Sequence, residues 1–389
     1  MAVSVIDPAV RAVMTKLNKQ YGAGTVIRGS DIKQPLRQTI TSGSLSFDAA
    51  LGGGWATGHW AEIVGHESVG KTFVVLKTIA ANQKIDPNFL TVWYATEDFS
   101  EPYAKMLGVD VDRVLIQNEV LMERVFQSAH DFLQTKAVDC MVIDSLPFLV
   151  SEREDEGDMD EYQPGHAAIL TGKFFRKSQG KIKRRLDLET ERTCTGLIIN
   201  GWRDTFVKYG DSRTTPGGKG KNFVFYQRVD LSRTEWILDS RKRPVGQTMQ
   251  LRNIKNKIAR PRLVGQVDAY VTDYRDHKAG SFDLAKDVVS AALAYDVVKK
   301  DGTWHLFGEE EWYGKPKLEK AAQEDSALRA RLRKEVLKAA AAPLTPTTQR
   351  RPSRAKGSTK KSVGRPRAQA SKKAGSQTTR RVGQREPAV

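Results

Sequence analysis

The segment GHESVGKT, residues 65–72, has the G-x-x-x-x-G-K-[ST] spacing of a phosphate-binding loop. A short apolar run, AEIV, leads into it, and TFVVLKTIAANQ after it has helical periodicity. In such a strand-loop-helix setting, backbone N–H groups of the loop and of the helix start bind phosphate oxygens. Lys71 is expected to reach the β- and γ-phosphates of a nucleotide, and the Thr72 hydroxyl to ligate Mg²⁺. The predicted nucleotide-binding residues here are Gly65, His66, Glu67, Ser68, Val69, Gly70, Lys71 and Thr72.

Two carboxylates follow apolar, strand-like runs further along the chain. VDCMVIDS contains Asp144 in the Walker B pattern, whose carboxylate holds Mg²⁺. Buried strands also end in aspartate for structural reasons, but a position after a phosphate loop in an alternating α/β chain favours the metal role. In WYATEDF, earlier in the chain, Glu97 follows directly on the strand after the first helix, at the sheet edge where ligands bind in α/β folds. Glu97 can deprotonate an attacking water there, and the adjacent Asp98 is open to the same interpretation.

Between about residues 34 and 210, strand-like runs alternate with helical segments. AEIV, LTVWYAT, VDRVLIQ, VDCMVIDS and TGLIIN are almost continuously apolar, which is typical of a parallel sheet covered on both faces. After residue 220, the runs FYQRVDLSRTEWI, TMQLRNIKNKI and QVDAYVTDY suit antiparallel strands that extend this sheet. The predicted fold class is therefore α/β, with a central, mostly parallel sheet.

Further elements are predicted on both sides of this core. VIDPAVRAVMTKLNKQYGAG predicts an amphipathic helix with Asp7 as N-cap, Pro8 in its first turn and Gly22 as its stop. Its apolar stripe needs a partner, either the chain's own core or another subunit. After residue 280, FDLAKDVVSAALAYDVV predicts a helix, VVKKDGTWHLF a hairpin turning at Asp301-Gly302, and KLEKAAQEDSALRARLRKEVLKAAA one final helix. We divide the chain into an N-terminal segment (1–33), a core (34–278), a small α+β C-terminal domain (279–342) and a tail (343–389).

The formal net charge of +17 is concentrated near the C-terminal end. Residues 343–389 contain thirteen Lys and Arg and one acid, Glu386, and so carry +12, which leaves +5 for the other 342 residues. This tail is almost without large apolar residues, so we predict that it is disordered and contacts nucleic acid, unless it serves only solubility. No run is apolar enough to span a membrane, no signal peptide is evident, and Cys140 and Cys194 lie in apolar runs. These features predict a cytoplasmic protein.

Taken in order, a set of motifs in this chain resembles the bacterial RecA recombinase family. They are TSGSLSFDAALGGGWATGHWAEIVGHESVGKT, ATEDFSEPYAKMLGVDVDRVLIQ, VDCMVIDS, TTPGGKGKNFVFYQRVDL, IKNKIARP and LAYDVVKKDGTWHLFGEEEWYGKPK. The resemblance runs from about Val5 to Ala341 and implies a RecA-like P-loop ATPase core. It also implies a DNA-dependent ATPase that uses ATP and Mg²⁺, forms helical filaments on single-stranded DNA, and promotes pairing and strand exchange with double-stranded DNA.

The resemblance implies roles for individual residues as well. Glu97 would be the catalytic base, and Tyr103 would stack on adenine. Lys255 and Lys257 of KNK would reach the phosphates bound by the next subunit, and Phe223 would lie at that interface. Cations suit phosphates, an aromatic ring suits base stacking, and glycines allow a close backbone approach. The implied DNA-binding positions are Arg176 and, in a loop at 201–218, Arg203, Lys208, Tyr209, Arg213, Gly217 and Gly218.

Three departures from the family pattern follow, of which the first two leave a second interpretation open. Gly201 stands where the family has a glutamine that senses the γ-phosphate, so coupling between ATP and DNA would be weaker or would use Asn200 or Arg203. The first DNA loop, at 153–166, is acidic here and has Pro164 in place of a methionine. The tail is basic, where well-known members have an acidic one. The alternative is a RecA-like DNA-binding accessory protein that uses ATP as a structural switch without efficient strand exchange.

Overall fold

The computed structural model describes residues 6–32, 38–158, 165–183, 192–204, 213–260 and 262–341. The predicted tail, Pro164, Lys208 and Tyr209 lie outside these ranges. All described residues belong to one unit, 1–342. The finer division at residues 33 and 278 stays a prediction. Within the described ranges, no helix is long and apolar enough to cross a bilayer.

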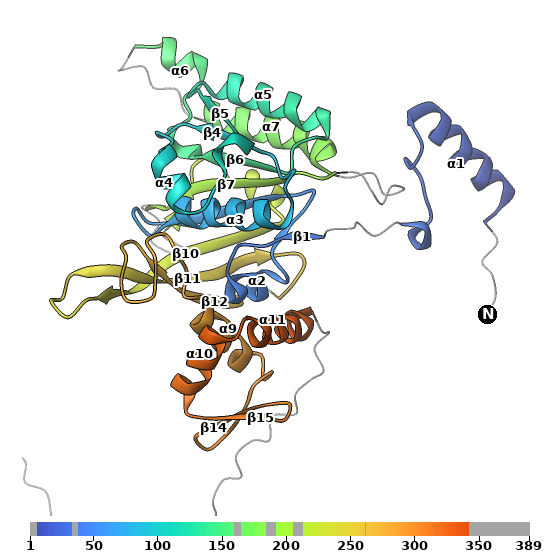
Figure 1. Ribbon diagram of the computed structural model, residues 1–389. Helices are drawn as coiled ribbons and strands as arrows, with labels where there is room; N and C mark the ends of the chain where they lie inside the picture. The colour runs from blue at the N-terminus through green and yellow to red at the C-terminus, as the bar shows by residue number, and fades with distance from the viewer. Residues whose placement is uncertain are drawn as a thin grey trace, which may run out of the picture. The chain divides into compact units, whose positions relative to one another are not determined.

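Eight strands form a central sheet in the order β12-β11-β10-β3-β7-β6-β4-β5 (Figure 1). The six strands from β10 to β5 run parallel to one another, and β11 and β12 are added antiparallel at one edge. The predicted α/β class with a mostly parallel sheet is therefore confirmed. The strands are β3 (Trp60–Gly65), β4 (Thr91–Ala95), β5 (Val114–Asn118), β6 (Cys140–Asp144), β7 (Thr195–Gly201), β10 (Gln227–Leu238), β11 (Pro244–Asn256) and β12 (Val264–Tyr270).

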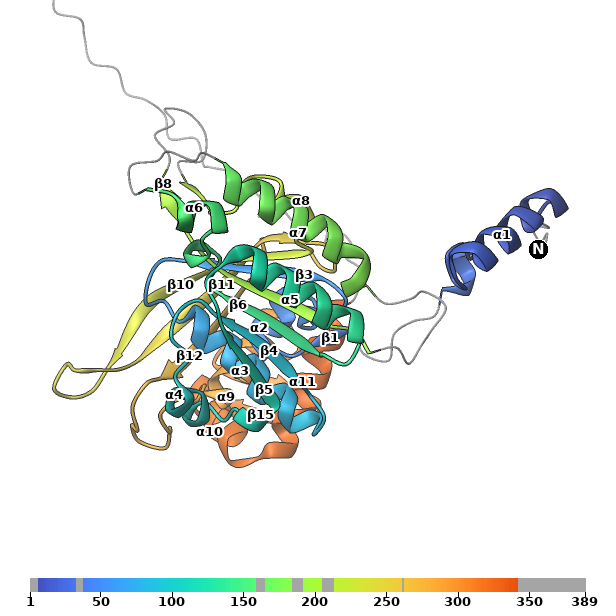
Figure 2. The ribbon, with the colours of Figure 1, turned by 90° about the horizontal axis from the view of Figure 1, so that it is seen from above.

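Helices cover both faces of this sheet because successive side chains of each strand point to opposite sides. In β6, Cys140 and Val142 join the core on the side of α3 (Lys71–Ile85). Met141 and Ile143 join a second core with α5 (Met122–Thr135) and α7 (His166–Ile182), which lie side by side in Figure 2. The continuous apolar character of the strands follows from this two-sided burial.

The N-terminal helix α1 (Pro8–Tyr21) has the predicted caps. Asp7 accepts a hydrogen bond from the Ala9 N–H at 2.7 Å, and Gly22 follows the last turn with a positive φ of 104°. No residue of α1 is buried by the rest of the described chain, and Val10 is 53% exposed. The predicted docking of this apolar stripe on another subunit stays a prediction.

The C-terminal segment has a separate apolar core, which includes Leu45 of α2 (Leu45–Leu51). The prediction of one final helix in this segment is wrong, because the structure has two helices there. Asp325 separates them, and its carboxylate accepts from the Ala327 N–H at 2.7 Å, an N-cap bond that begins a new helix. The elements are α9 (Leu284–Ala294), β13 (Lys299–Asp301), β14 (Trp304–Phe307), β15 (Glu310–Tyr313), α10 (Lys315–Glu324) and α11 (Ser326–Ala341).

The predicted hairpin in this segment forms, but its turn lies one residue later than expected. Asp301 pairs with Trp304, so the two loop residues are Gly302 and Thr303. Gly302 carries the positive φ, 56°, which a glycine adopts without strain. The shorter elements elsewhere are β1 (Thr39–Ile40), β2 (Trp55–Ala56), α4 (Glu101–Met106), α6 (Glu152–Glu156), β8 (Arg203–Asp204), β9 (Arg213–Thr214) and α8 (Lys221–Val224).

Candidate nucleotide and DNA site

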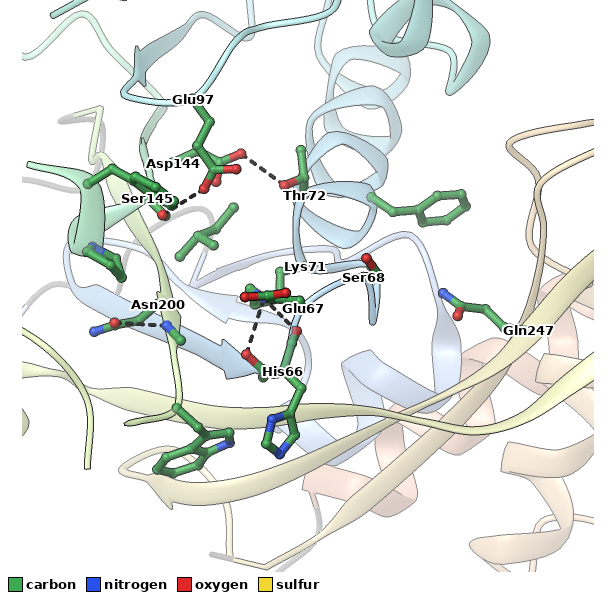
Figure 3. A pocket seen from close by; sticks show the side chains of 18 of the residues that line it. His66, Glu67, Ser68, Lys71, Thr72, Glu97, Asp144, Ser145, Asn200 and Gln247 are labelled. Carbon is green, nitrogen blue, oxygen red and sulfur yellow. Dashed lines mark hydrogen bonds between the residues drawn. The ribbon is translucent and has the colours of Figure 1, made fainter. Parts of the chain in front are cut away.

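The phosphate-binding loop joins β3 to α3 and closes around the Lys71 amino group (Figure 3). Lys71 Nζ donates hydrogen bonds to the carbonyl oxygens of His66, at 2.7 Å, and Gly65, at 3.2 Å. Burial lowers the pKa of Lys71, and the nearby carboxylates of Asp144, Glu97 and Glu67 oppose this effect. Phosphate oxygens in the loop would add negative charge beside the ammonium and favour its protonated form.

Side chains from the β10–β11 hairpin support this loop from outside, which sequence reasoning missed. Gln247 Nε2 donates to the Val69 carbonyl, and Arg233 Nη1 donates to the Ser68 carbonyl, both at 3.3 Å. Gly70 has a φ of 95°, and a Cβ at this position would overlap the Met249 side chain. The loop therefore depends on contacts with residues more than 160 positions away, which no local motif reveals.

Asp144 and Thr72 form the predicted pair for a metal. Thr72 Oγ1 donates to Asp144 Oδ2 at 2.9 Å. Asp144 is 6% exposed, and its burial, together with the charge of Glu97, raises its pKa to about 6 against the lowering effects of Thr72 and Lys71. A hydroxyl and a carboxylate are the hard oxygen ligands that Mg²⁺ prefers, and a cation there would keep Asp144 ionised.

Other ligands would have to complete such a metal site. Within the described ranges, no group of three His, Cys, Asp or Glu side chains is placed to hold a metal. Mg²⁺ usually binds through one or two protein oxygens together with water and substrate phosphates. The residues present therefore fit a magnesium-nucleotide complex better than a metal site made of protein alone.

The structure separates Glu97 from Asp98. Ser145 Oγ donates to Glu97 Oε1 at 2.8 Å, and Glu97 lines the same cleft as Lys71 (Figure 3). The backbone N–H of Glu97 also bonds the Asp144 carbonyl, at 3.2 Å, so the ends of β4 and β6 are tied together. Asp98 instead lines a different depression, beside Phe99. Of the two acids, Glu97 alone has the position that the sequence predicted for a general base.

The cleft as a whole has a volume of about 1050 Å³ and opens at the carboxyl ends of the parallel strands. Tyr103 of α4 lies in its wall, and burial raises the pKa of its phenol. A neutral aromatic ring in this position could stack on a base. The cleft also includes residues that the sequence did not assign to nucleotide binding, namely Ser145, Trp202, Trp236 and Gln247.

Lys255 and Lys257 do not line this cleft. Lys255 Nζ donates to the carbonyls of Asn222, at 2.7 Å, and Phe223, at 3.2 Å. Burial lowers the pKa of Lys255, with further lowering from Lys257 and Arg228. Lys257 Nζ lies 5.6 Å from the centre of the Tyr226 ring. The structure thus does not bring either lysine to its own phosphate loop, and a role at a neighbouring subunit stays a prediction.

The predicted DNA loop has an ordered stem. Arg203 in β8 pairs with Thr214 in β9, which also contains Arg213. Gly217 and Gly218 have φ values of 90° and 78°, and a Cβ at either would press on Leu146 or Ala168. These glycines therefore have a structural reason for their identity, whatever DNA contacts they make. Arg176 is exposed on α7, as a DNA contact requires.

A buried ionic network connects the phosphate-loop strand to this stem. Glu62 of β3 accepts from Lys221 Nζ at 2.9 Å, Arg228 Nε at 2.6 Å and Asn200 Nδ2 at 2.8 Å. Lys221 Nζ also donates to Thr215 Oγ1, in the segment that follows β9. Sequence reasoning missed this network, although a glutamate inside the apolar run AEIV was a visible signal.

Comparison with known proteins gives one consistent result. The family model described as the RecA N-terminal domain matches residues 8–273, which include every residue of the cleft. Protein RecA of Chlorobium limicola is 34% identical over 333 residues, which cover 83% of this chain and 90% of that protein. Protein RecA of Chlorobaculum tepidum is 32% identical over 340 residues, which cover 85% of this chain and 94% of that protein. Protein RecA of Corynebacterium glutamicum is 31% identical over 334 residues, which cover 85% of this chain and 84% of that protein.

Proposed function

Because the chain belongs to the RecA family, we propose that it is an ATP-dependent DNA recombinase. In this proposal it forms helical filaments on single-stranded DNA and promotes homologous pairing and strand exchange with double-stranded DNA. The observation that carries the ATPase part is the meeting of Lys71, Thr72, Asp144 and Glu97 in one cleft. An amine, a hydroxyl and two carboxylates at the strand ends match the needs of phosphoryl transfer.

Each of these residues has a proposed task in ATP hydrolysis. Lys71 exchanges its bonds to the loop carbonyls for bonds to phosphate oxygens, and the N–H groups of the loop bind the same oxygens. Thr72 and Asp144 hold Mg²⁺, which neutralises charge on the phosphates when bound. Glu97, oriented by the Ser145 hydroxyl, accepts a proton from the attacking water.

Filament formation is supported by surfaces that the described chain leaves uncovered. Phe223 is 82% exposed beside the carbonyls that hold Lys255. The stripe of α1 is likewise exposed at Val10 and Val13. A contiguous apolar stripe such as that of α1 is expected where another subunit docks. We therefore place Lys255 and Lys257 at the boundary with a neighbouring subunit, where their charge would stabilise its transferring phosphoryl group.

The test is steady-state ATP hydrolysis by the full chain, with and without single-stranded DNA. We expect DNA to stimulate turnover severalfold and Lys71→Ala to be inactive. Glu97→Gln should reduce the rate about 100-fold or more, because it removes the general base. Asp98→Asn is the matched control, since it changes the neighbouring acid outside the cleft and should retain turnover. Equal losses in both variants would contradict the assignment of Glu97.

A specific observation keeps the accessory function as a second candidate. Gly201 lines the cleft without a side chain, although a Cβ there would meet no heavy atom within 4 Å. The side chain of Asn200 could have taken the role of the one that Gly201 lacks, but it is buried and donates to Glu62 and the Pro216 carbonyl. Hydrolysis and DNA binding without strand exchange between single-stranded DNA and a homologous duplex would favour the accessory protein, and strand exchange that requires ATP would favour the recombinase.

A further inference from the structure

Trp202 lies between the nucleotide cleft and the stem of the predicted DNA loop. It follows Gly201, the last residue of β7, and precedes Arg203, the first residue of β8. Its side chain borders the cleft, and the Arg213 guanidinium of β9 lies 4.6 Å from the centre of its ring. Trp202 thus borders the cleft and, through its ring, contacts a residue of the DNA-loop stem.

One edge of this ring is held by the sheet. Trp202 Nε1 donates to Asp230 Oδ1 at 2.9 Å, and Arg252 Nη2 donates to the other oxygen of Asp230 at 2.7 Å. Asp230 is 8% exposed and pairs in register with Val64, the residue before the phosphate-binding loop. The indole is therefore anchored to β10, the strand paired with the one that enters the loop, and its ring face is left for Arg213.

The neighbouring residues are poorly placed for the same task. Gly201 has no side chain, and the Asn200 amide is occupied by Glu62, the Pro216 carbonyl and the Gly201 N–H. Arg203 is exposed and also lies in the cleft wall, but it belongs to the stem itself. Within the described part of 200–204, Trp202 is the residue whose side chain connects the sheet, the cleft and the opposite strand of the stem.

We propose that Trp202 is a positioning residue that couples the nucleotide state of the cleft to DNA affinity. A nucleotide that fills the cleft limits the movement of the indole, the indole holds the Arg213 guanidinium, and the guanidinium fixes the stem from which the DNA loop extends. This inference rests on the proposed function, because it requires both nucleotide and DNA binding. A cation–π contact of this kind corresponds to a factor of about 2 to 30 in an equilibrium constant, which sets the size of the expected coupling.

The experiment measures a coupling factor in the full chain. Affinity for a fluorescent oligothymidine is determined at saturating ADP and at a saturating, slowly hydrolysed ATP analogue, both with Mg²⁺. The coupling factor is the dissociation constant for DNA measured with ADP divided by the one measured with the ATP analogue. Nucleotide affinity is measured separately for every variant. Trp202→Leu should bring the factor close to 1. Trp202→Phe, which keeps a ring face but loses the bond to Asp230, should retain an intermediate factor.

Trp236 provides a matched control within the same cleft. It also lines the cleft and has an arginine, Arg233, 3.9 Å from its ring centre, but it lies on β10 and outside the DNA-loop stem. Trp236→Leu should therefore keep the coupling factor of the unaltered chain. A normal factor in Trp202→Leu, or an equal loss in Trp236→Leu, overturns the inference.

Failure of the proposed function has a different signature. If the unaltered chain binds nucleotide and DNA with a factor of 1, the coupling role of Trp202 is refuted while both binding activities stand. If the unaltered chain binds neither ligand, the recombinase proposal and the coupling role both fail. A factor above 1 that Trp202→Leu removes and Trp236→Leu preserves supports the inference.

Discussion

The buried network around Glu62 allows a sharp prediction about stability. The side chains of Glu62 and Lys221 are completely buried, and that of Arg228 is 11% exposed, so one carboxylate lies between two cations. Glu62→Gln leaves both cations around a neutral amide. Removing one partner of a buried ion pair costs about 3–5 kcal/mol, and the second orphaned cation places this variant at the upper end.

Lys221→Met should cost less, although it removes an equally buried charge. Glu62 would keep Arg228 at 2.6 Å and Asn200 at 2.8 Å, which leaves a neutral, hydrogen-bonded pair. Burial lowers the pKa of Lys221 despite the attraction of Glu62, so an apolar side chain of similar shape recovers part of the desolvation cost. The expected loss is about 1–3 kcal/mol, mostly from the bonds to Glu62 and Thr215.

Urea unfolding followed by tryptophan fluorescence and far-UV circular dichroism measures the difference. We expect the midpoint of Glu62→Gln to lie clearly below that of Lys221→Met, with unchanged slopes. The double variant should be more stable than Glu62→Gln alone, because one of the two unpaired cations is gone. A larger loss in Lys221→Met than in Glu62→Gln would refute the reasoning that Glu62 is the centre of the network.

Two further predictions concern the attachment of the C-terminal segment to α2. The Asp287 carboxyl accepts from the Leu45 N–H at 2.7 Å, and burial raises its pKa to about 6. Folding favours the protonated form of this carboxyl. Its contribution to the free energy of unfolding is therefore present below about pH 4 and is lost as pH rises through 6. The stability of the unaltered chain relative to Asp287→Asn should thus fall by up to about 3 kcal/mol between pH 4 and 7 in urea titrations. Arg333→Met should cost about 1–3 kcal/mol by thermal unfolding, because it leaves the buried Asp48 without its cation at 2.8 Å; an unchanged melting temperature contradicts this.

The sequence predicted the parts of the site that depend on local pattern. The phosphate-binding loop and Asp144 follow from a motif and an apolar strand, and the structure places both in the cleft. The choice between Glu97 and Asp98 was not local. It depends on Ser145, 48 positions away, and on how the ends of β4 and β6 are tied together.

Features that depend on pairing between distant segments could not be predicted. The partners of Glu62 lie 138, 159 and 166 positions away, and nothing in their own surroundings marks them as ionic partners. The break between α10 and α11 at Asp325 differs from the Glu62 network, because a local signal for it was present. QEDSA contains an aspartate that can cap a helix, but the strongly helical composition on both sides concealed this signal. Long-range charge pairing therefore needs the fold, while capping needs only closer attention to the sequence.

The short helix α8 contacts both the phosphate-loop strand and Lys255, the lysine that we propose reaches a neighbouring subunit's phosphates. Its first residue, Lys221, is held by Glu62 beside the phosphate-loop strand, and its carbonyls at Asn222 and Phe223 hold Lys255. If Lys255 turns toward a neighbour's phosphate, these carbonyls lose their charged donor, at a cost of about 1.5–3 kcal/mol before new bonds form. Phe223 is 82% exposed, so its side chain is free to move, whereas Lys221 before it and Phe225 after it are buried. A neighbour's nucleotide would therefore act at an exposed position of a segment that Lys221 ties to the chain's own phosphate-loop strand.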